Sequence, residues 1–249
     1  MRIYIDEGGT FQVPIGKDHL FSIVAALIIP ACKETDLFYQ FLRLRDAWGN
    51  QAIEIKGREL GETQIAHVID LLISFDVLFE FQLIDMGGHT TPQLEEFRAA
   101  QAKTVADSVT ADHQPTMIDE MKQLSHAILD TPLQLFVQAF LTIKLIGRVF
   151  ETATMYYCQR LPDELGRFDW VIDRKDRDVT PMEKLWTSLI VPVGIATSLK
   201  KPFTRLKGGD YSHMERFRAN TGDSKMRRLS NGWTRTSTST RRKFPAFST

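Results

Sequence analysis

The sequence predicts an α/β domain in which helices flank a mixed sheet. Short runs of β-branched and aromatic residues alternate with longer segments whose apolar residues recur every three or four positions. Glycine turns follow several of the short runs, and Thr-Pro pairs precede several of the long ones. Such alternation is typical of α/β proteins. We place the domain at residues 1–217.

The first two expected strands are joined across a glycine turn. Residues 2–6 are β-branched and aromatic and stop at Gly8-Gly9, which predicts a strand followed by a tight turn. Residues 21–29 have no polar face, so we expect a strand buried on both sides. An antiparallel pairing of these two strands would make the sheet mixed.

Two helices and a third strand are expected next. Residues 33–48 have the spacing of an amphipathic helix, and the charged connector Glu54-Ile55-Lys56-Gly57-Arg58 follows. Residues 64–75 predict a second helix, and residues 77–84 return to strand character before Asp85. The side chains expected to point inward from the second helix are Ile65, Val68, Ile69 and Leu72.

Thr-Pro pairs mark three later helices. We expect Thr91, Thr131 and Thr180 to be N-cap residues, with proline in each first turn. The helix from residue 132 to about 158 carries a phenylalanine-rich stripe and should be central to the core. A further strand is expected at residues 168–173.

Charge is distributed unevenly along the neutral chain. Residues 200–249 hold 13 Lys and Arg against 3 Asp and Glu, a net charge of +10, so the first 199 residues carry −10. Residues 218–249 form a basic tail rich in Ser and Thr, which predicts disorder or a segment atypical of the fold. Such a tail could contact nucleic acid, an acidic partner or the acidic body of the chain.

The composition predicts a cytoplasmic protein with no membrane span. Two cysteines cannot form a disulfide framework or a four-cysteine zinc site, and the chain opens without a secretory leader. The longest apolar run, residues 21–32, is too short to cross a bilayer. The sequence leaves the oligomeric state open.

Three expected strands end in aspartate: Asp6, Asp85 and Asp173. Ligands of open α/β sheets bind outside the carboxyl ends of the strands, so these acids would converge if their strands are parallel neighbours. Carboxylates that lie close together hold a divalent cation or repel one another. The alternative interpretation is that each aspartate forms a local turn.

Three short motifs resemble the domain of unknown function 3800 family. They are Tyr4-Ile5-Asp6-Glu7-Gly8-Gly9, Glu54-Ile55-Lys56-Gly57 and Val171-Ile172-Asp173-Arg174-Lys175, and their order and spacing cover about residues 1–217. That family is mostly bacterial and phage-related. The resemblance implies a ribonuclease-H-like mixed central sheet with flanking helices. The family has no settled activity.

The resemblance also implies site residues. Asp6 and Asp173 would be metal ligands, Glu7 an acid beside the first of them, and Lys56 a cation at a scissile phosphate. Such folds complete the site with a late acid, for which Asp210 is the candidate. The sequence departs from the family in two places: Gly8 replaces the usual serine, and no apolar helix near the end of the chain carries an aspartate.

The leading hypothesis is a nuclease or phosphodiesterase that depends on Mg²⁺ or Mn²⁺, with nucleic acid as its partner. The alternative is a non-catalytic interaction or defence-associated module on the same fold, which the missing late acid favours. A third interpretation takes Asp6-Glu7-Gly8-Gly9-Thr10 as the first phosphate turn of sugar kinases and actin-like ATPases, although the chain is short for two such domains.

Overall fold

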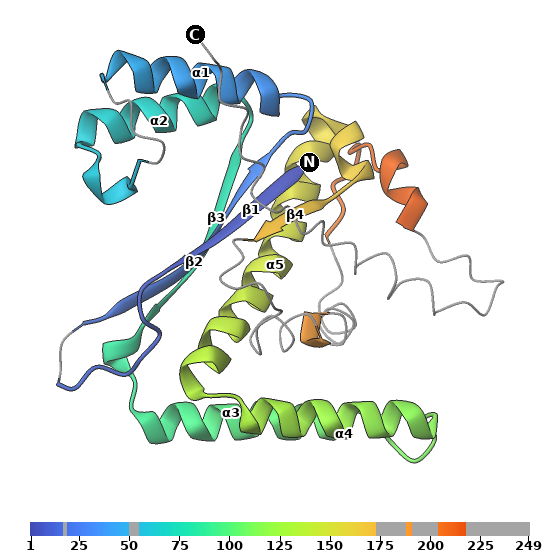
Figure 1. Ribbon diagram of the computed structural model, residues 1–249. Helices are drawn as coiled ribbons and strands as arrows, with labels where there is room; N and C mark the ends of the chain where they lie inside the picture. Colours follow the sequence, from blue (N-terminus) through green and yellow to red (C-terminus); the bar gives the residue numbers. More distant parts are fainter. Residues whose placement is uncertain (17–18, 50–54, 173–187, 191–203, 218–249) are drawn as a thin grey trace, which may run out of the picture.

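The computed structural model describes residues 1–16, 19–49, 55–172, 188–190 and 204–217. Within these residues a four-stranded sheet has the order β3-β2-β1-β4 (Figure 1). The ranges of its strands are β1 (Arg2–Gly8), β2 (Phe21–Ile29), β3 (Leu78–Asp85) and β4 (Asp169–Ile172).

The sheet is mixed, as the sequence predicts. β2 is antiparallel to both β1 and β3, whereas β4 is parallel to β1. Consequently β1, β3 and β4 all run in one direction. We call the side of the sheet where these three strands begin the amino rim, and the side where they end the carboxyl rim.

One face of the sheet packs on the long helix α5 (Leu133–Arg160), which confirms the central helix predicted from the phenylalanine stripe. α5 is long and apolar enough to cross a membrane by length and composition, but more than half of its apolar window is buried inside the protein. Such burial is typical of a core helix. The side chains between α5 and the sheet include Ile3, Ile5, Val24, Ala26, Ile28, Leu145, Val149 and Tyr157.

Helices α3 (Thr91–Ala106) and α4 (Pro115–Asp130) lie side by side beneath the start of α5 (Figure 1). The predicted caps differ here. The N-cap of α3 is Thr90 rather than Thr91, and its backbone N–H donates to Gln93 Oε1 at 2.9 Å. Thr131 does not cap α5, because its hydroxyl donates to the carbonyl of Ala127 at 2.6 Å and so ends α4 instead.

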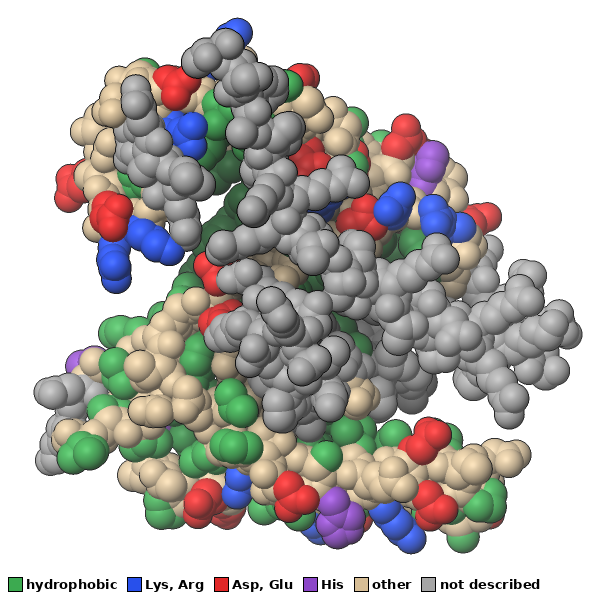
Figure 2. All heavy atoms as spheres, viewed as in Figure 1, with side chains coloured by type: hydrophobic (Ala, Val, Ile, Leu, Met, Phe, Trp, Pro, Cys, Tyr) green, Lys and Arg blue, Asp and Glu red, His purple; other side chains and the backbone are tan. Residues whose placement is uncertain are grey.

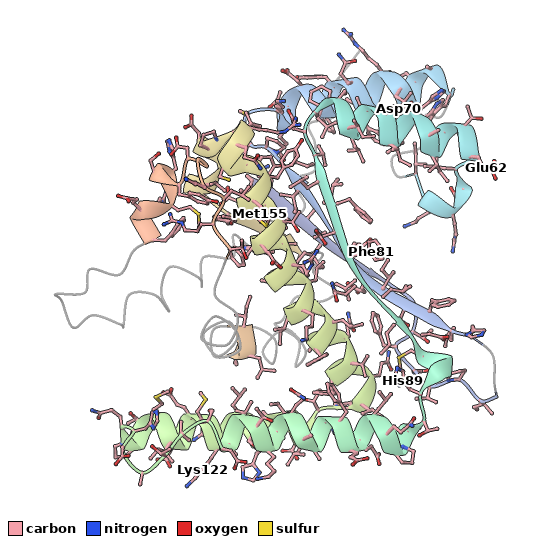
Figure 3. All side chains as sticks on the ribbon, turned by 180° about the vertical axis from the view of Figure 1, so that it is seen from behind. Glu62, Asp70, Phe81, His89, Lys122 and Met155 are labelled. Carbon is pink, nitrogen blue, oxygen red and sulfur yellow. The ribbon has the colours of Figure 1, made fainter. Side chains whose placement is uncertain are left out.

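Helices α1 (Glu34–Ala47) and α2 (Glu62–Ser74) form a hairpin inserted between β2 and β3. In Figures 1 and 3 this hairpin projects from the amino rim. Glu34, at the start of α1, accepts hydrogen bonds from Arg2 (2.7 Å) and from the hydroxyl of Tyr4 (2.5 Å). Both residues lie on the sheet face opposite α5, so α1 begins on that side.

Two sequence expectations about burial are wrong. Ile65 and Ile69 of α2 were expected inward but are 43% and 50% exposed. β2 is fully buried along its α5 face, whereas on its other face Ile29 is buried but Phe21 is 55% exposed. Helical or apolar periodicity identifies the apolar face of an element, whereas the presence of a covering layer depends on distant parts of the chain.

Ionic groups are concentrated at the amino rim. The ammonium of Met1 is fully buried and lies 2.6 Å from the carboxylate of Glu164, which belongs to the short helix η3 (Pro162–Gly166). The same carboxylate accepts the backbone N–H groups of Ala31 (2.9 Å) and Cys32 (3.1 Å). Burial alone would raise the pKa of Glu164, but the ammonium and these two donors lower it below its ordinary value.

Asp76 joins three elements at the same rim. It occupies the turn between α2 and β3 with φ +54° and pairs with Lys33 before α1. It also accepts hydrogen bonds from Tyr156 (2.9 Å) and Arg160 (3.1 Å) at the end of α5. The hydrogen bond from Lys33, followed by that from Tyr156, lowers the pKa of Asp76.

Candidate metal centre

The carboxyl end of β1 presents an exposed aspartate. Ile5 is buried against α5, Asp6 is exposed on the opposite face, and Glu7 is half-buried on the α5 side. Successive strand residues point to opposite faces, so Asp6 and Glu7 do not share one. The Oδ1 atom of Asp6 accepts the backbone N–H of Glu7 at 2.9 Å. Carboxylate oxygens therefore face outward at the rim.

The parallel pairing of β1 with β4 shows which residues of the two strands lie side by side at the carboxyl rim. Ile5 is the register partner of Ile172, the last residue of β4. The next residues in sequence are Asp6 and Asp173. Asp173 itself lies outside the described residues. Two adjacent parallel strands are thus in register up to the positions that immediately precede the two predicted ligands.

Gly9 has a structural reason to be glycine. Its φ is +95°, and a Cβ there would lie 2.6 Å from Ser22 Oγ and 2.8 Å from the carbonyl oxygen of Phe21. Only glycine adopts this conformation readily and permits such close approach of β2. The glycine in the Asp-x-Gly-Gly-Thr pattern is therefore accounted for by the turn into β2, without a bound phosphate.

Asp85, the third strand-end acid, is used within its own turn. It caps the short helix η2 (Met86–Gly88), and its Oδ1 accepts the N–H groups of Gly87 (3.0 Å) and Leu20 (3.1 Å). Its Oδ2 lies 2.5 Å from His19 Nδ1. The hydrogen bond with His19 and the two backbone donors lower the pKa of Asp85.

Asp85 and Asp6 are at the same rim but not beside one another. The register partner of Asp6 is Ala25, and that of Ala25 is Phe81, four residues before Asp85. Strand rise and interstrand spacing then place the two aspartates about 16 Å apart between Cα atoms. β2 and β3 continue to pair beyond the end of β1. The prediction that the three strand-end aspartates converge is therefore wrong for Asp85.

Asp210 lies near the end of α5 and not beside Asp6. Its backbone N–H donates to the carbonyl of Cys158 at 2.8 Å, and its carboxylate accepts the N–H of Ser212 at 2.9 Å, which lowers its pKa. The neighbouring Tyr157 reaches the carbonyl of Ile28 at 3.3 Å, close to where β1 begins. The structure therefore places Asp210 at the amino rim.

Lys56 is exposed on the connector between α1 and α2, directly before the short helix η1 (Gly57–Glu59). This connector belongs to the helical hairpin and not to the sheet. A hollow separates the hairpin from the lower part of the molecule (Figure 2). The hairpin projects from the amino rim, whereas Asp6 is at the carboxyl rim, so Lys56 and Asp6 come from different parts of the fold.

The donor set fits a hard divalent cation in part. Asp6 offers exposed carboxylate oxygens, the ligands that Mg²⁺ and Mn²⁺ prefer. Across the described ranges, no three His, Cys, Asp or Glu side chains gather closely enough to hold a metal ion. A site with three such ligands at Asp6 would therefore need residues outside those ranges, such as Asp173.

The pairing of His19 with Asp85 was not predicted from the sequence. The imidazole is 80% exposed and stacks on the ring of Phe21, with 6.1 Å between centroids and 5° between planes. The two partners are 66 positions apart and neither belongs to a histidine motif, so no local signal indicated the pair. The register of β2 with β3 brings them together.

Comparison of the chain with protein-family models, with curated proteins and with solved structures finds no match. The fold is accordingly described from its own topology: a mixed α/β sheet of four strands with flanking helices.

Proposed function

We propose that the chain is a ribonuclease-H-like phosphodiesterase or nuclease in which Asp6 and Asp173 hold a divalent cation. The observation that carries this proposal is the parallel register of β1 with β4, in which Ile5 and Ile172 are partners. The mixed sheet with β4 added parallel to β1 supports the fold part of the proposal. The family resemblance supports the choice of ligands.

The chain's own residues would bind and position a phosphodiester at the carboxyl rim. Asp6 is exposed on the open face of the sheet, where a strand of nucleic acid can approach it. Lys56 is exposed on the hairpin, and its positive charge can neutralise a phosphate group of the nucleic acid. A bound Mg²⁺ or Mn²⁺ would supply charge neutralisation and an activated water.

Cleavage assays on the full chain test this function. We expect the protein to cleave DNA or RNA with Mg²⁺ or Mn²⁺, and both Asp6→Asn and Asp173→Asn to abolish cleavage and the heat of Mn²⁺ binding in calorimetry. Asp112→Asn is the matched control, because Asp112 is an exposed aspartate in the loop between α3 and α4. Unchanged cleavage or unchanged Mn²⁺ binding in both rim variants would contradict the proposal.

A second candidate is a non-catalytic interaction module on the same fold. It is favoured by the absence of a three-ligand cluster among the described residues and by the position of Asp210 at the amino rim. This alternative predicts no cleavage of any nucleic acid by the wild-type chain. It also predicts that Asp6→Asn leaves partner capture unchanged.

A further inference from the structure

A surface made by α2 and β3 exposes large apolar side chains. Six of them are 43–69% exposed, although aliphatic and aromatic residues of this size are usually buried. Phe81, labelled in Figure 3, lies in the middle of β3. We call this set the α2–β3 apolar surface; its members are Ile65, Ile69, Ile73, Phe79, Phe81 and Leu83.

The outward direction of the β3 side chains is fixed by the opposite face of the strand. Glu80, between Phe79 and Phe81, points to the α5 side, where it accepts the hydroxyl of Thr152 at 2.5 Å and lies 3.9 Å from Arg148. A slip of one residue would bury the phenylalanines but break these contacts. The exposure is therefore a specified property of the strand.

The isoleucines of α2 face the hollow between the hairpin and the lower part of the molecule (Figure 2). They recur every four residues and so form one stripe. His67 and Leu71 line the groove between α1 and α2, and helical geometry places the stripe on the opposite side of α2 from that groove. α1 lies above α2 in Figures 1 and 3, so the stripe faces down, toward the hollow whose interior is hydrophobic in Figure 2.

The α2–β3 apolar surface is large enough for an interface. Six half-exposed side chains of this size present on the order of 600 Å² of apolar area. That equals or exceeds the largest patch on a typical monomer and approaches the roughly 800 Å² per partner of a standard interface. The half-buried Ile23 and Leu27 of β2, on the same face, extend it further.

We propose that a second copy of this chain covers the surface in a symmetric dimer. In a twofold contact both copies use the same patch, and side chains near the axis meet their own copies, so a charge near the axis would face an equal charge. The cross-strand rows of β2 and β3 that form this face contain no ionisable side chain in their central three pairs, Leu27–Phe79, Ala25–Phe81 and Ile23–Leu83. Self-association therefore brings no like charges together in these three pairs; the exposed Asp6, the β1 partner of Ala25, borders them on the same face and lies outside the surface as defined.

The two halves of the surface are similar in length. α2 is a helix of 13 residues, about 20 Å long, and β3 is a strand of 8 residues, about 26 Å long. In the dimer, the isoleucine stripe of one copy packs on the phenylalanine row of the other, and the reverse contact forms at the same time. Each copy thus supplies the amphipathic helix that fills the partner's hollow.

Other occupants fit this surface less well. Residues 218–249 are basic and rich in Ser and Thr, with no apolar period to match the stripe. Single-stranded nucleic acid would stack on Phe79 and Phe81, but the central rows hold no cation for its phosphates, and Lys56, which we assign to a phosphate at Asp6, belongs to the hairpin and not to these rows. Aliphatic Ile69 and Leu83 fit another protein surface better than a base.

Light scattering after size-exclusion chromatography tests the dimer. We expect the full chain to have twice its mass of 28.5 kDa. Phe81→Lys and Ile69→Asp should each give a monomer with unchanged circular dichroism, because both side chains are half-exposed. Met117→Lys is the control: Met117 of α4 is 43% exposed but outside the surface, so its dimer should persist.

Mixing the two variants sharpens the test. If Ile69 of one copy meets Phe81 of the other, Ile69→Asp and Phe81→Lys chains should recover a dimer together that neither forms alone. A wild type that stays monomeric over a wide concentration range overturns the proposal, as does a dimer that survives both substitutions. A monomer that binds a single-stranded oligonucleotide and loses it in Phe81→Ala would assign the surface to nucleic acid instead.

Discussion

The two rims of the sheet use their acidic residues differently. At the amino rim, Glu164 is 6% exposed and Asp76 pairs with two cations and a tyrosine, so both carboxylates stabilise the joints between elements. At the carboxyl rim, Asp6 is exposed and accepts the N–H of its own neighbour. Acids that hold the fold together are thus separated along the strands from the acid available to a ligand.

Asp85 is intermediate between these cases. It lies at the carboxyl rim but accepts two backbone N–H groups and pairs with His19. Position at a strand end therefore does not decide the role of an aspartate. The role depends on how many hydrogen-bond donors of the protein already contact the carboxylate oxygens. This number can be changed by mutation.

The largest effect on stability is expected at Glu164. Glu164→Gln removes one member of a buried ion pair and leaves the ammonium of Met1 without its counter-charge, which should cost about 3–5 kcal/mol in the free energy of unfolding. Urea denaturation measures this. An effect no larger than that of Glu34→Gln, whose partner Arg2 is partly exposed, would contradict this, because the buried pair would then stabilise the protein no more than a partly exposed one.

The second-largest effect on stability is expected from low pH, which should weaken the ion pairs of the amino rim. The folded-state pKa of Glu164 is lowered, so this group stabilises the protein above its unfolded pKa near 4.5, and the contribution is lost as pH falls through the folded value. Asp76 acts in the same direction. Unfolding midpoints measured from pH 7 down to pH 3 should decline less steeply in Glu164→Gln than in the wild type. Parallel curves would contradict this assignment.

The smallest effect on stability is expected at the carboxyl rim. Asp85→Asn weakens the cap of η2 and the contact with His19, and should lower the melting temperature modestly because the site is exposed to solvent. The metal-dependent cleavage that we propose should be retained, since Asp85 is about 16 Å from Asp6. Differential scanning calorimetry and a cleavage assay on the same sample separate the two properties. Loss of cleavage at full stability would place Asp85 in the site.

The sequence predicts elements better than it predicts their surroundings. The strand at residues 21–29 and the helix over 64–75 are where the patterns indicate, yet Phe21 and Ile69 are exposed. An apolar face is a local property of the sequence. Whether another layer covers that face depends on residues far along the chain and, in our proposal, on a second chain.

The candidate site shows the same limit. Asp6 and Asp85 have the same local signature, an acid after an apolar strand and before glycine, so the sequence treats them alike. Only the register tells them apart, because Asp6 lies opposite Ala25 whereas Asp85 lies opposite Phe21. Pairing between distant strands is settled by tertiary packing, and a single sequence does not encode it in any short motif.

The α1–α2 hairpin has a consequence for chain entropy. Gly8 and Ile23, partners in the first ladder, are fifteen positions apart, whereas Ile28 and Leu78 in the second are fifty apart. Closing the longer loop costs about 1 kcal/mol more in an unstructured chain. Helix formation within the insertion shortens the effective path between the two strands. The pairing of β2 with β3 is thus made easier by two helices that are not part of the sheet.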